Sequence, residues 1–311
     1  MKKLCCRLTL CCIGYLFCIQ AFAAAPEQLL LQDIRALSED QMQGRKTGQP
    51  GAELARDYIT QRFKQLELRS FTDNFSQPFS YASGFSQKQG INLLGWIKGC
   101  SHPDLFIVVT AHYDHLGMTG RSVYNGADDN ASGVATMLAL ASKFQQQCPA
   151  YSYIFVATDA EENGLFGAKA LVKQAPVPLD QIVLNLNLDM LSRGEKKNLL
   201  YLYGARSLPG VSDYVKQQSF ALKLKLRRQG KAQGQSGTDW ANASDHAAFR
   251  KAGIPFLYFG VDPHADYHSV KDDWQKINPD FLQAMFVTLS QVVFWLDQQP
   301  PAWYQAARKN K

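Results

Sequence analysis

The sequence has no internal repeats, no low-complexity tracts and only a small excess of one charge sign. Its 311 residues carry 33 basic and 27 acidic side chains, and the formal charge of +6 falls to +3 without Lys2, Lys3 and Arg7 at the N-terminus. So small an excess gives no reason to expect a nucleic-acid partner. With 46% hydrophobic residues, the chain has the composition of an ordinary globular protein.

Long hydrophobic runs are also scarce, and one of them lies at the N-terminus. Met1–Lys3 is basic, Leu8–Ile19 is apolar, and Ala21–Ala23 offers small residues before a cleavage site. This order predicts a secretory signal peptide over residues 1–23, because the apolar part is too short to favour a membrane span. A retained N-terminal anchor is the alternative. We expect no later apolar run of membrane-spanning length, and therefore an exported monomer, periplasmic or secreted, without a stable membrane anchor.

Cysteine is scarce outside this leader. Five of the seven cysteines leave with it, and Cys100 and Cys148 remain in the expected mature chain. Each precedes an apolar segment with strand character, 105–110 and 151–157 respectively. If these strands are parallel neighbours, both cysteines lie at the same edge of the sheet. An oxidising compartment then favours a disulfide, with two free thiols as the alternative.

Apolar segments of strand length alternate with segments of helical periodicity along most of the chain. Buried strands separated by helices predict one α/β domain, residues 24–311, with helices on both faces of its sheet. Residues 71–85 show no clear period and stay unassigned, and the polar tail 300–311 is expected to be loosely held. The expected strands are 91–97, 105–110, 151–157, 182–188, 199–203, 222–226 and 255–259, and the expected helices are 55–66, 131–146, 164–174, 209–219, 244–251 and 279–296.

Acids and histidines follow four of the expected strands. His112 follows the first of them, Glu161 and Glu162 the second, Asp189 the third, and His268 lies in the loop after 255–259. Because ligands bind beyond the carboxyl ends of the strands in an open α/β sheet, we expect these side chains to share one site.

A loop of small and acidic residues, 125–133, completes this set. It holds Asp128 and Asp129 directly before a segment of helical length, whose first turn Asn130 or Ser132 could cap. A turn with a capping acid is the alternative for this loop alone. Histidine and carboxylate ligands suit zinc, and also manganese or cobalt. Five candidate ligands indicate two metal ions sharing one carboxylate, and they are His112, Asp129, Glu162, Asp189 and His268.

Two further acids have positions that suit supporting roles. Asp114, two residues after His112, can accept the second ring N–H of a metal-bound histidine and fix its orientation. A surface His–Asp pair is the alternative. Adjacent side chains point in different directions, so Glu162 can bind metal while Glu161 faces the bound water as general base. A solvated pair of glutamates is the alternative.

Six motifs resemble, in the same order, those of the secreted bacterial zinc aminopeptidases, a family that also includes glutamate carboxypeptidases and glutaminyl cyclases. The resemblance runs from about Gln43 to beyond Asp273. It implies a single-domain zinc-exopeptidase fold with a mixed, mostly parallel sheet. The motifs are AHYDHLG (111–117), GADDNASG (126–133), AEENGLFG (160–167), NLDM (187–190), SDHAAF (244–249) and DYH (266–268).

The resemblance also implies a ligand set and an activity. One zinc is expected on His112 and Asp189, the second on Glu162 and His268, with Asp129 rather than Asp128 as the bridge. The implied enzyme binds two zinc ions and removes N-terminal residues from peptides that have a free N-terminus. Glu161 is its base, and Tyr267 stands where a tyrosine of some relatives polarises the substrate carbonyl.

Two other functions remain open at this point. A glutaminyl-peptide cyclotransferase of the same fold uses one zinc and needs no complete second site, whereas a receptor-like relative with a dead site predicts missing ligands. None of the five ligands is missing here. His115 and His264 are expected to be structural or surface residues, and His246 is expected either to line the pocket or to be packed.

Overall fold

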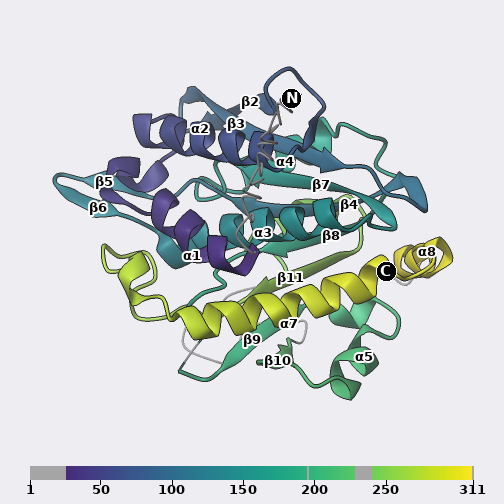
Figure 1. Ribbon diagram of the computed structural model, residues 1–311. Coiled ribbons are helices and arrows are strands. Elements are labelled where there is room, and N and C mark those ends of the chain that lie inside the picture. Colours follow the sequence, from purple (N-terminus) through teal and green to yellow (C-terminus); the bar gives the residue numbers. More distant parts are fainter. Residues whose placement is uncertain (1–25, 195, 228–239, 310–311) are drawn as a thin grey trace, which may run out of the picture.

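A nine-stranded sheet lies at the centre of the computed structural model, which describes residues 26–194, 196–227 and 240–309 (Figure 1). The expected signal peptide, residues 1–23, lies outside these ranges. The strand order is β1-β3-β7-β4-β8-β11-β9-β10, and β2 pairs with β3 outside this path. Strands β7, β4, β8 and β11 are parallel to one another, while β3 and β9 join this group antiparallel on either side. The sheet is therefore mixed with a parallel centre, as expected.

The strands and helices have the following bounds. The strands are β1 (Arg69–Ser70), β2 (Ser76–Ser83), β3 (Ser86–Ile97), β4 (His102–His112), β5 (Gly117–Thr119), β6 (Ser122–Tyr124), β7 (Tyr151–Thr158), β8 (Ile182–Leu188), β9 (Leu199–Tyr203), β10 (Lys223–Leu226) and β11 (Phe256–Gly260). The α-helices are α1 (Pro26–Leu37), α2 (Pro50–Gln65), α3 (Gly133–Gln146), α4 (Phe166–Lys173), α5 (Val211–Gln217), α6 (His246–Lys251), α7 (Pro279–Asp297) and α8 (Pro301–Lys309).

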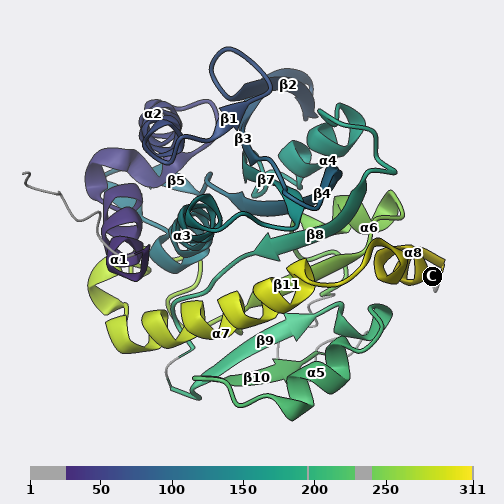
Figure 2. The same ribbon diagram turned by 45° about the vertical axis from the view of Figure 1, so that its right-hand side comes forward.

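Helices cover both faces of the sheet, which explains why the residues of its central strands are buried and mostly apolar. Successive residues of a strand point to opposite faces. Val109 of β4 therefore joins the core cluster formed with α1, α2, α3 and α7, while Val108 packs with Leu171 of α4 and Phe249 of α6. Figure 2 shows α3 and α7 on one side of β8, and α4 and α6 on the other.

Two segments differ from the expectation drawn from the sequence. The unassigned stretch 71–85 contains β2, which forms a hairpin with β3. The tail expected to be loosely held forms α8, so that expectation is wrong up to residue 309. The buried Tyr304 donates its hydroxyl hydrogen to the carbonyl of Leu296 at 2.7 Å, and the indole N–H of Trp303 donates to the carbonyl of Pro209 at 2.9 Å.

Helix α7 corrects a further expectation, namely that no apolar run after the leader is long enough to span a membrane. Among the described residues, α7 is long and apolar enough to cross a membrane by length and composition. Its Phe286 and Leu289 are fully buried in the main core cluster. The helix therefore packs as a core helix along the sheet (Figure 1).

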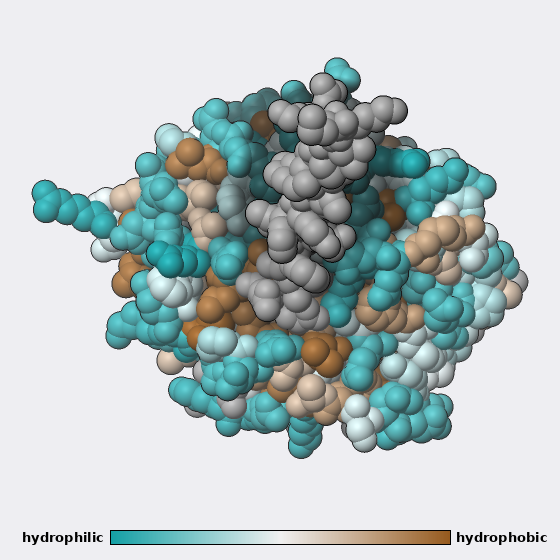
Figure 3. Space-filling model, viewed as in Figure 1, coloured by the Kyte–Doolittle hydropathy of each residue, from teal (hydrophilic) through white to brown (hydrophobic). Residues whose placement is uncertain are grey.

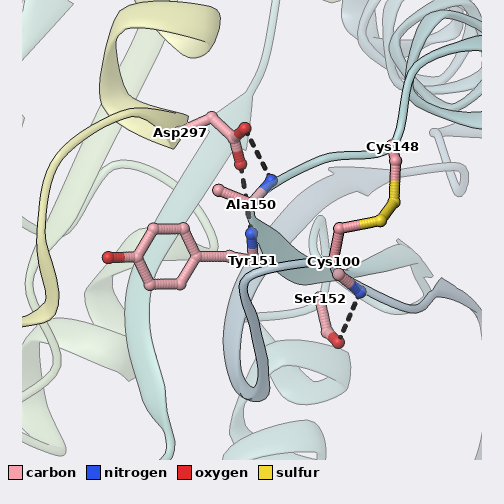
Figure 4. The surroundings of a disulfide bond; sticks show 7 residues. Cys100, Cys148, Ala150, Tyr151, Ser152 and Asp297 are labelled. Carbon is pink, nitrogen blue, oxygen red and sulfur yellow. Dashed lines mark hydrogen bonds between the residues drawn. A yellow bond between two sulfur atoms is a disulfide. The ribbon is translucent and has the colours of Figure 1, made fainter.

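A disulfide between Cys100 and Cys148 joins the segments that precede β4 and β7, as predicted, with 5.9 Å between the Cα atoms (Figure 4). The two strands are parallel neighbours, so both cysteines lie at the amino end of the strands. Asp297 at the end of α7 supports the same edge, because its carboxylate accepts the N–H of Ala150 at 2.8 Å. The residues expected to bind metal lie at the opposite, carboxyl end of these strands.

Candidate metal centre

Three buried side chains meet beyond the carboxyl ends of β4 and β8. His112 is the last residue of β4, Asp189 directly follows β8, and Asp129 lies in the turn Ala127–Ser132 before α3. The Nε2 atom of His112 lies 3.3 Å from Oδ1 of Asp129 and 3.3 Å from Oδ1 of Asp189. These three residues form a first group that could hold a metal ion.

A second group, formed by Asp129, Glu162 and His268, lies on the other side of Asp129. The Oδ2 atom of Asp129 is 3.0 Å from Nε2 of His268, in the loop after β11. The same nitrogen is 3.4 Å from Oε1 of Glu162, in the loop after β7. The two oxygens of Asp129 thus face two different histidines, and the five side chains expected to be ligands lie together.

The spacing of these atoms fits zinc. Bonds of about 2.0–2.1 Å in tetrahedral geometry place neighbouring ligand atoms roughly 3.3 Å apart. The distances from His112 and His268 to their carboxylate partners range from 3.0 to 3.4 Å. Imidazole and carboxylate donors also suit manganese and cobalt, so the donor set favours a borderline or hard divalent ion.

The backbone behind Asp129 is fixed by another carboxylate, that of Asp272. Its oxygens accept the N–H of Asp128 and the N–H of Asp129, both at 3.0 Å. Asn130 completes the turn, because its Oδ1 atom accepts the N–H of Gly133 at 2.9 Å and satisfies the first turn of α3, as predicted. Burial disfavours the charged form of Asp129, yet hydrogen bonds with His112 and His268 hold its pKa well below its usual range.

Asp114 supports the site in a different way from the one expected. The Nδ1 atom of His112 lies 3.1 Å from the backbone carbonyl oxygen of Asp114, whereas the carboxylate of Asp114 is 3.9 Å away. This carboxylate instead accepts the backbone N–H of Glu161 at 3.0 Å and that of Glu162 at 3.3 Å. Asp114 therefore orients His112 through its main chain and holds the glutamate pair through its side chain.

Glu161 lines the pocket beside the first group of ligands. Burial raises the pKa of Glu161 well above its usual range; His112 opposes this rise, and the neighbouring Asp189 adds to it. A bound cation would lower this pKa again, because it stabilises the carboxylate. The group is thus placed where it can take up a proton and release it.

The five ligands and Glu161 line a pocket of about 210 Å³. Tyr267 borders it and stacks on the ring of His268, with 3.8 Å between the ring centres. Burial and the nearby carboxylates raise the pKa of Tyr267, so its phenol keeps the proton and can donate a hydrogen bond. The rest of the wall is largely apolar and consists of Met190, Trp240, Ala243, Tyr258, Val261 and Pro263.

The structure assigns a role to Asp128 that the sequence did not reveal. Its fully buried carboxylate accepts the N–H of Ser192, in the loop after Asp189, at 2.7 Å. Its other oxygen lies 3.1 Å from Nε2 of His264, in the loop that carries His268. Asp128 thus links three loops that carry ligands. His264 therefore has a structural role, one of the two roles expected for it.

Two other histidines differ in their relation to the pocket. His246 is buried in α6, with its Nε2 atom 2.7 Å from the carbonyl oxygen of Trp240 and its ring stacked on Phe256, so it packs behind the pocket wall. His115, in contrast, lies beside the second group, with Nδ1 2.9 Å from Oε1 of Glu162, and together with Asp129 and Glu162 it forms a set of side chains that could itself hold a metal ion. The only signal for His115 in the sequence was its place three residues after His112.

Comparisons with known proteins agree with this site. The family model described as Peptidase family M28 matches residues 92–293. Aminopeptidase YwaD of Bacillus subtilis (strain 168) is 30% identical over 87% of this chain and 54% of its own length. The alkaline phosphatase isozyme conversion protein of Escherichia coli (strain K12) is 30% identical over 58% of this chain and 55% of its own length. The chain therefore spans about half the length of these curated relatives.

Solved structures share the fold. The zinc aminopeptidase BSAP from Bacillus subtilis superimposes with a TM-score of 0.69 at 16% identity, covering 88% of this chain and 95% of that one. The glutaminyl cyclase of Fimbriiglobus ruber gives a TM-score of 0.67 at 19% identity, again over 88% of this chain and 95% of that one. Two activities thus occur on this fold, and the residues of the site must distinguish between them.

Proposed function

Because the chain belongs to peptidase family M28, we propose that it is an exported zinc aminopeptidase that removes N-terminal amino acids from peptides. The observation that carries this proposal is the position of Asp129. Its two oxygens face two histidines that have separate carboxylate partners, Asp189 and Glu162. A site for a single zinc would need only one of these groups.

The chain's own residues have defined tasks in the proposed reaction. Two zinc ions held by the five ligands would polarise the substrate carbonyl and lower the pKa of a bound water. Glu161 takes the proton of the attacking water and delivers it to the amine that leaves. Tyr267 donates a hydrogen bond to the carbonyl oxygen as negative charge develops there.

The walls of the pocket favour a peptide with a free amine and an apolar first side chain. Among the carboxylates that line the pocket, that of Glu161 is left uncoordinated by the proposed zinc centre and can attract an ammonium group. Trp240 and Met190 contribute apolar surface to the same pocket. A volume of about 210 Å³ accommodates one side chain rather than a long peptide.

Export is part of the same proposal. The disulfide between Cys100 and Cys148 supports it, because such bonds persist in oxidising compartments. The predicted signal peptide supports it from the sequence. Periplasmic and secreted locations fit both observations.

The experiment measures zinc per chain together with hydrolysis of a panel of aminoacyl amides and their N-acetylated forms. The proposal expects two zinc ions per chain, cleavage only of substrates with a free amine, and faster cleavage of leucyl or phenylalanyl than of glutamyl amides. One zinc per chain, with cyclisation of N-terminal glutamine and no amide cleavage, would establish the glutaminyl-peptide cyclotransferase instead.

A further inference from the structure

His115 lies beside the second group of ligands although the five-ligand set does not need it. Its side chain is fully buried, with Nδ1 2.9 Å from Oε1 of Glu162 and 3.8 Å from Oδ2 of Asp129. Its Nε2 atom has no hydrogen-bond partner among the described residues. The ring is thus directed at Glu162 through one nitrogen alone.

We propose that His115 is a positioning residue that donates its Nδ1–H to Oε1 of Glu162 and so sets the orientation of this ligand. The 2.9 Å separation is the usual length of an N–H···O hydrogen bond. With the proton on Nδ1, the ring also leaves no unpaired N–H in the interior.

The ring of His115 is packed closely enough to orient the side chain of Glu162. A Cβ atom on Gly126 would lie 2.6 Å from Cδ2 of His115, so the ring packs directly against the glycine backbone. Gly126 has a φ of +55°, which also favours glycine there. The imidazole therefore lies between the Asp129 loop and Glu162.

The proposed hydrogen bond should affect the metal affinity of only one of the two positions. This inference rests on the two-zinc centre of the proposed function. Oε1 of Glu162 is also 3.4 Å from His268, so the orientation of Glu162 bears on the second group. The first group, His112, Asp129 and Asp189, includes neither Glu162 nor His115. Loss of the His115 hydrogen bond should therefore weaken one metal position and leave the other nearly unchanged.

The test compares His115→Ala with His115→Asn in the purified full-length chain. The amide nitrogen of asparagine occupies about the place of Nδ1, where it can donate a hydrogen bond but does not replace an imidazole ligand. Zinc affinities come from competition with a chelator, and the absorption spectrum of the cobalt-loaded chain reports the geometry of each position. His102→Asn is the matched control, because His102 packs against Tyr151 at the disulfide end of the sheet, far from the metal centre.

The expected result is that His115→Ala weakens binding of the second zinc by about 10- to 100-fold, as for other residues that orient a ligand. Binding of the first zinc should change less than threefold, and His115→Asn should recover most of the lost affinity. If His115→Ala binds both ions as tightly as the parent chain, the proposal is wrong. If His115→Asn loses as much affinity as His115→Ala, His115 is itself a ligand, and the positioning role is overturned.

Thermal unfolding of the metal-free variants identifies any that fail to fold, and in that case His115→Asn decides alone. The parent chain is measured first. A parent that binds only one zinc overturns the two-zinc centre itself, which separates failure of the proposed function from failure of the role of His115.

Discussion

The guanidinium group of Arg45 donates a hydrogen bond of 2.9 Å to the carbonyl of Gly126, three residues before Asp129. It also donates to three further backbone carbonyls, one of them that of Tyr113 next to His112. The side chain is completely buried, and burial lowers its pKa to about 10 against the opposing charges of Asp129 and other carboxylates. Arg45 thus stays charged at neutral pH, and a fixed cation lies behind the carboxylate-rich centre.

We predict that Arg45→Met lowers the free energy of unfolding by about 3–5 kcal/mol, because it leaves several buried carbonyls without a donor and removes the charge that balances the carboxylates. Denaturant unfolding of the metal-free chain measures this loss. Arg121→Met is the matched control, since Arg121 is exposed and its replacement should cost less than about 0.5 kcal/mol. A loss below about 1 kcal/mol for Arg45→Met would show that the buried cation is dispensable.

A second prediction concerns Glu161. Its replacement by glutamine keeps the shape of the side chain and removes the ability to take a proton. We expect Glu161→Gln to retain both metals and to lose about 10²- to 10⁴-fold in kcat, the usual contribution of a general base. Steady-state kinetics on an aminoacyl amide, with metal analysis of the same sample, checks both parts.

The control for this variant is Glu53→Gln, because Glu53 lies exposed in α2. It should leave kcat unchanged. An unchanged kcat for Glu161→Gln would remove Glu161 from the role of base, and loss of a metal would show that Glu161 is a ligand instead.

The central strands were predictable because the pattern of apolar residues along the sequence reflects which residues are buried. The mainly apolar sequences of β4, β7, β8 and β11 identify strands that are covered on both faces, although Asn185 and Asn187 interrupt β8. Once these strands are parallel, their carboxyl ends meet, and the position of His112, Glu162 and Asp189 at one edge follows. The metal centre was therefore accessible from the sequence because chain order and sheet geometry determine it together.

The residues that support the centre were not predictable, because their partners are remote in sequence. Arg45 contacts carbonyls that lie up to 81 residues away, and a lone arginine in a loop usually indicates solvent exposure. Asp272 binds N–H groups 143 and 144 residues away. The order of the tail was missed for a related reason, since Trp303 contacts Pro209 and Tyr304 packs against Tyr151, both remote in sequence.

A third prediction concerns the shared carboxylate. We expect Asp129→Ala to lose metal and activity together, because this side chain contributes an oxygen to each group of ligands. Metal analysis after dialysis should show less than one tightly bound zinc per chain, and hydrolysis should be lost with the metal, because the metal would supply both the Lewis acid and the activated water. Asp213→Ala, on the exposed face of α5, serves as control. Retention of two tightly bound zinc ions by Asp129→Ala would refute the bridging role.

A fourth prediction concerns the disulfide, which should contribute to stability and not to catalysis. The Cys100–Cys148 bond closes a loop with a sequence separation of 48, which in the chain-entropy model stabilises a protein by about 4 kcal/mol. Cys100→Ser/Cys148→Ser should therefore unfold at a lower denaturant concentration, by about 2–4 kcal/mol once native-state effects are included. Its turnover at 25 °C should stay within about twofold of the parent, because the bond lies at the amino end of β4 and β7 and the ligands lie at the carboxyl end.

Added reductant should shift the unfolding midpoint of the parent and leave that of the double variant unchanged. A large loss of turnover in a folded, fully metal-loaded double variant would mean that this edge of the sheet governs the geometry of the centre, contrary to the separation seen here.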